Sequence, residues 1–395
     1  MAELKGANTN PWYVLMTLYE EQEGEEIDWH LHAQNLEVWN AWACQDLDDE
    51  ERAKLTADGV ELPEPGAWDA MATKVKRKHR AEFKRRNGEA EAYPGLPDVG
   101  NRVNLSEITF SNTVVLEKVI FTQDAFFRSA TFTQAADFRS ATFTQGAYFS
   151  SATFTEGADF MSAVFEGRAY FLRAKFGEPV ENEPSLLRLT DAQFSQPANF
   201  RDAKFLNRYP DFTGTIVHDK SLFPSERQNW PGKTDQDATK GRDSCAFLRH
   251  HVSKQGQPEA EHFFFRREMQ FAEQIGGFWE RLPYRLFGWV SDYGHSIAQP
   301  AKWLGCVWLG CALIYMVVFN WPGAITPSEV IPAGKGFGFS LANMFKFFGF
   351  QRTYYPDLIE ALPRWLKFLA AFQTVVSYVL IFFLGLGLRQ RFRLR

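Results

Sequence analysis

The side chains that could carry out chemistry in this chain are few, and their spacing does not suit a reaction. His250, His251, Glu261 and His262 lie close together in the sequence, but they lack the HExxH spacing that places two histidines on one helix face for zinc. His30 and His32 precede Cys44 and sit among Trp29, Trp39 and Trp42, which favours packing over metal binding. We expect no metal site at either place.

Other catalytic signatures are missing from the sequence. It has no glycine-rich phosphate loop, no dinucleotide glycine pattern, no GxSxG turn and no pair of carboxylates spaced for acid–base work. The four cysteines are too scattered for a disulfide framework or a CxxC site, which favours a reducing compartment. We therefore expect a chain that is not an enzyme and binds no cofactor.

Composition points to buried or lipid-facing aromatic rings. The 395 residues carry 43 Lys and Arg against 48 Asp and Glu, a net charge of −5, which excludes a generally cationic nucleic-acid binder and an acidic disordered chain. Phe accounts for 38 residues, and Tyr and Trp add 12 each. An exposed ring costs about 25 cal/mol per Å² of apolar surface, so most of these rings must be stacked, buried or in lipid.

Large apolar residues recur through the middle of the chain with alternating gaps of six and five, a period of 11 residues. They are Phe110, Leu116, Phe121, Phe127, Phe132, Phe138, Phe143, Phe149, Phe154, Phe160, Phe165, Phe171 and Phe176. A small residue precedes most of them by two positions, as at Ala130, Ala136, Ala141, Ala147, Ala152, Ala158 and Ala163. The pattern resumes at 192–205 after an interruption at 177–190. Missing such a period would misassign the whole fold.

This period suits a coiled β-structure. A helical stripe needs apolar residues at every third or fourth position, whereas here the residues between are Thr, Ser, Gln, Gly and Asp. In an extended chain, residues two apart point the same way, so each Ala and the Phe that follows it face inward together. A corner every five or six residues then turns the chain onto the next wall.

Over 107–205 the pattern resembles the Phe-centred variant of the pentapeptide-repeat family. The resemblance implies a right-handed quadrilateral β-helix over 94–218, with the Phe and Ala ladders inside and two 11-residue units in each coil. The segment 110–176 would then form about three coils.

The outer wall of such a rod carries neutral polar side chains, including Thr133, Thr144 and Thr155. We expect these threonines to form a rigid surface that binds an unknown cytoplasmic protein. Some members of the family mimic DNA, but 107–176 carries six basic and seven acidic residues, whereas a duplex has one negative charge per about 1.7 Å. Mimicry of DNA is therefore not expected.

Two segments near the C-terminus, 303–321 and 366–388, are apolar and long enough to span about 30 Å of hydrocarbon. Arginines dominate the tail 389–395, namely Arg389, Arg391, Arg393 and Arg395, and the positive-inside rule would keep this tail in the cytoplasm. The N-terminus has no signal-peptide pattern. We expect a multi-pass protein of the bacterial inner membrane, with both termini cytoplasmic and the lipid bilayer as a partner.

The segment 322–365 between these spans would be an extracytoplasmic loop with an amphipathic or re-entrant segment. Residues 337–350 are apolar but too short to span. Some membrane-anchored relatives resemble two-helix potassium channels, but 348–353 lacks the Thr-x-Gly-Tyr-Gly filter, and Arg352 would repel cations. We favour a helix lying on the outer leaflet, and keep an oligomeric ion channel or transmembrane sensor as the alternative, in which copies would form a homo-oligomer.

The remaining segments complete the predicted organisation. Residues 219–277 read as a linker and helical hairpin and 278–302 as an interfacial elbow, both similar to the region that follows the repeats in membrane-anchored relatives. Residues 1–93 read as an α-helical cap with a basic run at 74–86. Its cations, like those of the C-terminal tail, are candidates for contact with anionic lipid; contact with nucleic acid is less favoured. The cations of the basic run are Lys74, Lys76, Arg77, Lys78, Arg80, Lys84, Arg85 and Arg86.

Overall fold

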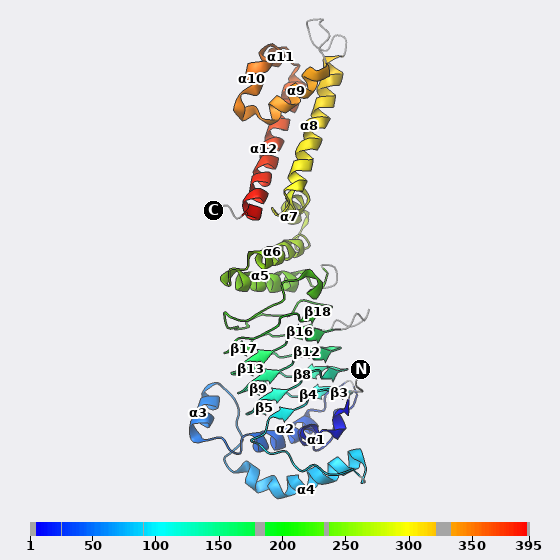
Figure 1. The fold of residues 1–395 in the computed structure, drawn as a ribbon, viewed down its shortest axis with the longest axis vertical. Coiled ribbons are helices and arrows are strands. Elements are labelled where there is room, and N and C mark those ends of the chain that lie inside the picture. The colour runs from blue at the N-terminus through cyan, green and yellow to red at the C-terminus, as the bar shows by residue number, and fades with distance from the viewer. Residues whose placement is uncertain are drawn as a thin grey trace. The chain divides into compact units, whose positions relative to one another are not determined.

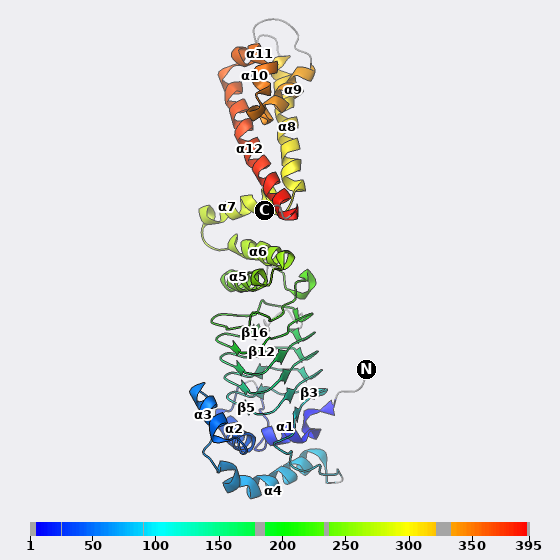
Figure 2. The same cartoon turned by 60° about the vertical axis from the view of Figure 1, so that its left-hand side comes forward.

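The computed structural model describes residues 5–24, 26–89, 91–177, 186–232, 237–320 and 333–392. The chain divides into two compact units, Met1–Phe271 and Ala272–Arg395. The first contains a β-solenoid with helices at both ends, and the second is helical (Figures 1 and 2).

Four α-helices precede the solenoid, and side-chain caps fix where several of them begin. They are α1 (Pro11–Met16), α2 (Trp29–Ala43), α3 (Asp49–Ala57) and α4 (Ala67–Asn87), with a 3₁₀ turn η1 (Ala7–Thr9) before them. The Asp28 carboxylate accepts from the backbone N–H groups of His30 and Leu31 at the start of α2. Asp48 and Glu51 form a reciprocal capping box at the start of α3.

The solenoid consists of short parallel strands that pair one coil apart. The strands are β2 (Val103–Asn104), β3 (Ile108–Phe110), β4 (Val114–Val115), β5 (Ile120–Phe121), β6 (Ala125–Phe126), β7 (Thr131–Phe132), β8 (Ala136–Asp137), β9 (Thr142–Phe143), β10 (Ala147–Tyr148), β11 (Thr153–Phe154), β12 (Gly157–Asp159), β13 (Val164–Phe165), β14 (Ala169–Tyr170), β15 (Lys175–Phe176), β16 (Leu186–Arg188), β17 (Gln193–Phe194) and β18 (Lys204–Phe205). They form four sheets: β3-β7-β11-β15-β18, β2-β6-β10-β14, β4-β8-β12-β16 and β5-β9-β13-β17.

The register confirms the predicted solenoid with two 11-residue units in each coil. Phe132 pairs with Phe154, 22 residues further on, and Phe154 pairs with Phe176 after the same interval. Phe176 then pairs with Phe205, so the interval lengthens across the interruption in the repeat. The handedness and the four-sided cross-section stay predictions.

Stacked phenylalanine rings fill the interior. Phe127 and Phe149 stack with centroids 4.8 Å apart, and Phe138 and Phe160 stack at 4.7 Å, close to the spacing between paired strands. Neighbouring ladders meet edge to face, as where Phe127 contacts Phe138 with an interplanar angle of 89°. The predicted ladder residues of 121–176 are no more than 3 % exposed.

One corner in each 11-residue unit has left-handed backbone geometry. Every second residue of the inner ladder, such as Phe127, Phe138 and Phe149, is followed two positions later by a residue with a φ between 53° and 59°. These residues are Glu107, Lys118, Ser129, Ser140, Ser151, Ser162, Arg173, Asp191 and Asp202. Since none is glycine, each corner carries some strain, which the regular pairing above and below must offset.

The N-terminal helices cover the first coil. Trp39 donates from its indole Nε1 to the Ile120 carbonyl oxygen at 3.0 Å, and Asn40 bonds both the Lys118 carbonyl and the Ile120 N–H. Backbone groups of the solenoid edge therefore have partners, which removes a template for pairing with another chain. The cap is not purely helical, because β1 (Lys5–Gly6) pairs with β3 and joins the sheet.

The last coil is covered by a 3₁₀ turn and two helices, η2 (Arg227–Asn229), α5 (Ala238–Lys254) and α6 (Pro258–Ala272). Trp230 stacks on Phe205 at 4.6 Å and contacts Phe264 of α6 edge to face. Phe223 stacks on Phe200 at 5.2 Å, so the inner ladder continues beyond the predicted limit at 218.

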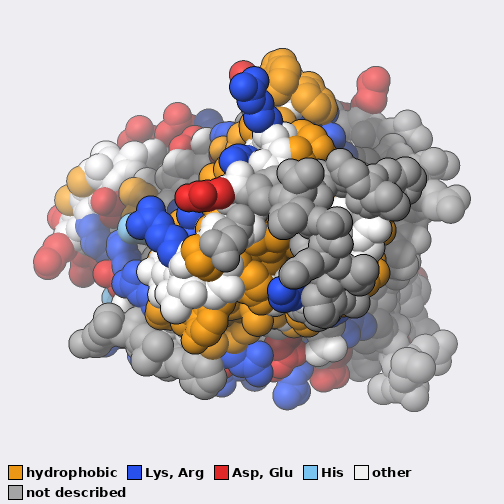
Figure 3. All heavy atoms as spheres, turned by 90° about the horizontal axis from the view of Figure 1, so that it is seen from above, with side chains coloured by type: hydrophobic (Ala, Val, Ile, Leu, Met, Phe, Trp, Pro, Cys, Tyr) orange, Lys and Arg blue, Asp and Glu red, His pale blue; other side chains and the backbone are white. Residues whose placement is uncertain are grey.

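The C-terminal unit has two long apolar helices, α8 (Ala298–Phe319) and α12 (Arg364–Phe392). Both are long and apolar enough to cross a membrane, and 22 % and 28 % of their apolar windows are buried. The shorter elements are α7 (Phe278–Ser291), α9 (Ala333–Met344), η3 (Lys346–Phe348), α10 (Phe350–Tyr354) and α11 (Pro356–Ala361). Figure 3 shows hydrophobic side chains next to Lys and Arg side chains in the view from above Figure 1.

Helix α9 packs against both α8 and α12. Phe339, Ser340 and Asn343 are 0 % exposed, and Gln373 of α12 donates to the Ser340 hydroxyl at 2.8 Å. Both forms predicted for this loop, an amphipathic helix on the outer leaflet and a re-entrant segment, stay predictions.

Candidate interaction site

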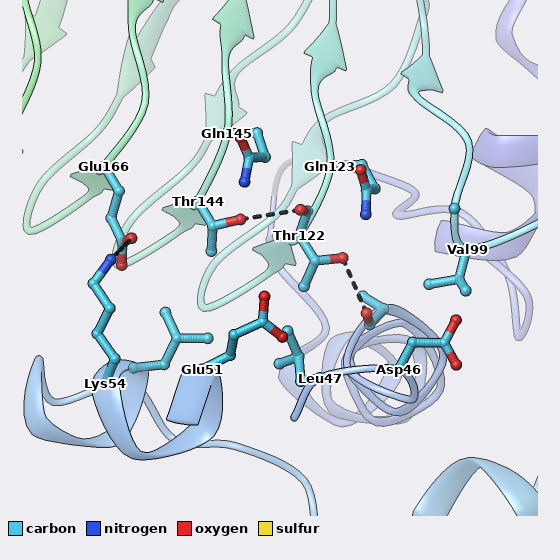
Figure 4. A pocket seen from close by; sticks show the side chains of 13 residues that line it. Asp46, Leu47, Glu51, Lys54, Val99, Thr122, Gln123, Thr144, Gln145 and Glu166 are labelled. Atoms are coloured by element: carbon cyan, nitrogen blue, oxygen red, sulfur yellow. Dashed lines mark hydrogen bonds and ion pairs between the residues drawn. The ribbon is translucent and has the colours of Figure 1, made fainter. Parts of the chain in front are cut away.

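A polar groove lies between helix α3 and one corner of the solenoid (Figure 4). We call residues 45–66 the α3 arm and the cavity beneath it the arm groove. The arm groove has a volume of about 300 Å³, within the range of small-molecule and peptide subsites. Its polar lining residues are Asp46, Glu51, Lys54, Thr122, Gln123, Thr144, Gln145 and Glu166.

The arm is held to the solenoid by few contacts. Leu55 is the one residue of α3 that is buried. Lys54 forms an ion pair with Glu166 at the wall, and Lys118 forms one with Glu61 at 3.1 Å. Exposed ion pairs contribute about 0–1 kcal/mol each, so the arm is held much less firmly than the ladders inside the coil.

The charge of the arm groove is negative. Asp46, Glu51 and Glu166 supply three carboxylates against one ammonium, that of Lys54. The hydrogen bond to Glu166 raises the pKa of Lys54 above its usual value. The other Glu166 oxygen, Oε1, is buried without a hydrogen-bond donor among the described residues. A cationic, donor-rich occupant fits this lining.

A second hollow of about 390 Å³ lies on the other side of the arm. It is lined by Asp58 to Glu61 of the arm and by Ser140, Thr142, Ser162, Val164, Asp191 and Gln193 of the solenoid, among others. The outward side chains of β9 and β13 thus lie along a hollow that the arm partly covers.

The three predicted wall threonines lie on two walls rather than one. Thr133 and Thr155 follow β7 and β11, which pair in one sheet, whereas Thr144 follows β9 in another sheet. Two of the hydroxyls bond internally: Thr133 donates to the Phe110 carbonyl oxygen at 3.0 Å, and Thr144 donates to that of Thr122 at 3.1 Å. Thr144 alone lines the arm groove.

Much of the predicted basic run on α4 has partners within the cap. Arg86 donates to the Thr17 carbonyl oxygen at 2.5 Å and to Glu82, and its side chain is 4 % exposed. Arg85 pairs with Glu82 and Glu20, and Lys84 with Glu89. Lys78 and Arg80 lie over aromatic rings, while Lys74, Lys76 and Arg77 are exposed. Of the tail, Arg389 and Arg391 lie in the last turn of α12, and Arg393 and Arg395 lie outside the described residues.

Several of the histidines and cysteines are buried in the packed interior. His32 bonds the Glu117 carbonyl oxygen and His251 that of Ser221, and burial lowers the pKa of both imidazoles. Burial raises the pKa of the Cys44 thiol to about 12. Across the part of the chain that the structure describes, no three His, Cys, Asp or Glu side chains gather as a metal site would require.

A second aromatic ladder runs along the outside of the solenoid, and the sequence analysis missed it. Phe126, Tyr148 and Tyr170 stack with centroids 4.4 and 5.0 Å apart, and the Arg128 guanidinium lies over the first two rings. An aromatic residue directly before every fourth ladder Phe, at intervals of 22 residues, is the signal that could have revealed it. Because the ring faces contact one another, this ladder stiffens the wall and leaves few faces for a ligand.

Comparison with known proteins identifies the repeat. Residues 127–175 match the family model for pentapeptide repeats in nine copies. No curated protein and no solved structure matched the chain. Residues 127–175 of the solenoid are therefore pentapeptide repeats, and the chain also has two helices that are long and apolar enough to cross a membrane.

Proposed function

We propose that this chain is a membrane-anchored scaffold, without enzymatic activity, whose solenoid binds another protein through the arm groove. Helices α8 and α12 would hold it in the bacterial inner membrane, with the solenoid and both termini in the cytoplasm. The observation that carries this proposal is the contrast between a rigid solenoid wall and a lightly held arm that leaves a negative groove between them. A basic, donor-rich segment of a partner fits that groove.

The repeat itself supplies a matched control for a test. Gln145 is exposed in the arm groove, and Gln134, 11 residues earlier, occupies the same repeat position on another wall. A photo-crosslinking residue placed at each position in the full chain, in native membranes, should yield one defined protein adduct from position 145 and none from position 134. Equal adducts at both positions, or none at either, would contradict the groove as the binding surface.

Substitution should agree with the crosslinks. Thr144→Lys places a cation in the groove and should remove the adduct, because the lysine competes for the same carboxylates. Thr155→Lys, on the other wall, should leave the adduct intact. Both variants should keep the proteolytic fragment pattern of the parent chain.

A pore formed by several copies is the second candidate, and the buried polar network of α9 favours it. Tyr315 donates to Gln373 at 3.1 Å, and Gln373 donates to Ser340. Asn343 Oδ1 and Ser377 Oγ are buried without partners among the described residues. Polar groups that are buried between spanning helices often mark an ion path or a contact between copies. Single-channel steps in bilayers that are lost in Gln373→Leu would support the pore, and silent bilayers with a monomer in detergent would exclude it.

A further inference from the structure

Helix α7 has an apolar surface that other helices leave uncovered. Phe278, Trp279, Leu286 and Trp289 are 62, 79, 47 and 59 % exposed. Trp279 and Leu286 lie seven residues apart and Leu286 and Trp289 three apart, which places these side chains on one side of the helix as a stripe. A large exposed apolar stripe of this kind marks a surface that contacts a membrane or another protein.

The turn after α7 fixes how this helix meets α8 and α12. The Tyr293 ring lies against Gly288, where a Cβ would come within 2.8 Å of the ring, and its hydroxyl donates to Glu273 at 2.8 Å. Ser291 accepts from Gly294 N–H through its hydroxyl at 3.0 Å. Such a closed turn does not let α7 continue the axis of α8.

Aromatic contacts hold α7 against both α8 and α12. Trp289 and Trp303 have ring centroids 4.2 Å apart, and Phe287 lies 5.6 Å from Phe383 of α12. As a result α7 runs across the axes of α8 and α12 (Figure 2). If those two helices cross a bilayer, α7 must lie in its surface plane, with its tryptophans at the depth where aromatic belts form.

The polar side chains of this corner are mainly cations. Residues 277–302 and 389–391 carry Arg281, Arg285, Lys302, Arg389 and Arg391 against the acids Glu280 and Asp292. Glu280 is occupied as the cap of α7, where it accepts from the Gly277 N–H at 2.9 Å. Among the described residues, the buried Arg281 Nε has no acceptor. A buried donor without an acceptor is costly, and a phosphate oxygen is the acceptor that arginine binds best.

We infer that α7 is an in-plane membrane helix whose Arg281 and Arg285 bind the headgroup phosphate of an anionic phospholipid. The two arginines lie one turn apart, so they are neighbours on the helix surface. The apolar stripe enters the acyl boundary while the guanidinium groups stay at headgroup depth. This inference rests on the membrane anchoring proposed above, and it is independent of the arm groove.

The test uses the full chain in nanodiscs of phosphatidylcholine with one tenth phosphatidylglycerol, and native mass spectrometry to count retained lipids. Preferential retention of phosphatidylglycerol is expected, and Arg281→Gln with Arg285→Gln should weaken it by about 30-fold, from the usual effect of two cations near a charged surface. The matched control is Lys346→Gln with Arg352→Gln, which removes two exposed cations elsewhere in the same unit. The control pair should retain phosphatidylglycerol like the parent.

Three other outcomes would overturn the inference, and they distinguish the headgroup site from the membrane anchoring. Equal losses in both variant pairs, or equal retention of the two lipids, would refute a specific headgroup site while leaving the anchoring intact. A thermal shift from inorganic phosphate in pure phosphatidylcholine discs that matches the shift from phosphatidylglycerol would indicate a free-phosphate site instead. A chain that fails to enter nanodiscs would refute the anchoring as well. Unchanged proteolytic patterns in detergent would show that the variants fold.

Discussion

Removing one inner ring should destabilise the solenoid far more than removing the neighbouring outer ring. Phe149 is 0 % exposed, stacks on Phe127 at 4.8 Å and Phe171 at 5.0 Å, and meets two further rings edge to face at 5.5 Å. Phe149→Ala deletes all of these contacts and leaves a cavity that paired strands above and below cannot close. The expected loss in the free energy of unfolding is about 3–5 kcal/mol.

Tyr148→Ala is the matched control, because Tyr148 precedes Phe149 and stacks in the outer ladder, where it is partly exposed. Its loss should cost about 1–2 kcal/mol. The measurement is pulse proteolysis of the full chain in detergent across a urea series, following cleavage within the solenoid. A midpoint for Phe149→Ala that equals the midpoint for Tyr148→Ala would refute the assignment of inner and outer ladders.

Three further outcomes follow from the corners, the packing and the buried histidines. Ser151→Val should cost about 1–2 kcal/mol more than Ser150→Val in the same assay, because φ is 59° at Ser151 and a β-branched residue resists that geometry; equal costs would contradict the left-handed corner. Ala147→Leu should lose about 1–3 kcal/mol by overpacking a 0 % exposed position, and an unchanged midpoint would mean the position has room. Burial lowers the pKa of His79 below 6.5, so the unfolded chain takes up a proton that the folded chain does not. The urea midpoint of the cap should therefore be highest above about pH 6.5 and fall towards pH 5.5, and a midpoint that rises over that interval would contradict the buried neutral imidazole.

The neutral form of His79 also follows from its partners. The Pro11 carbonyl oxygen can only accept, so Nε2 at 2.9 Å carries the hydrogen and donates. Nδ1 then accepts from the Tyr93 hydroxyl at 2.8 Å. A second proton on the ring would remove that acceptor, and His79→Asn should flatten the pH dependence.

The sequence predicted the inner ladders well because their physical requirement repeats. Each Ala and Phe pair must face inward in every unit, so a period of 11 residues determines both the sheet register and the buried set. The left-handed corners escaped prediction because Ser129, Ser140 and Ser151 carry no glycine signal, and the regular pairing forces their geometry. Strand β1 escaped for a related reason: two residues at the start of the chain have no pattern, and their partner is about 100 residues away.

The arm groove and the packing of helix α9 depend on tertiary contacts that no local pattern encodes. The apolar run at 337–350 fits both a leaflet helix and a re-entrant helix, and its hydrogen bond from Gln373 to Ser340 joins residues 33 apart in the sequence. Likewise, Lys54 and Glu166 are far apart in sequence and meet only because the arm folds back on the wall. The sequence predicts Thr144 as a wall residue, but it lines the arm groove only because the α3 arm folds over that wall.

The membrane anchoring of the solenoid is the claim on which the remaining proposals depend, and alkaline carbonate extraction tests it most directly. Carbonate strips peripheral proteins from opened membranes and leaves those with spanning helices. The account predicts that the full chain stays with the sedimented bilayer, held by α8 and α12. Recovery of the intact chain in the supernatant would contradict it.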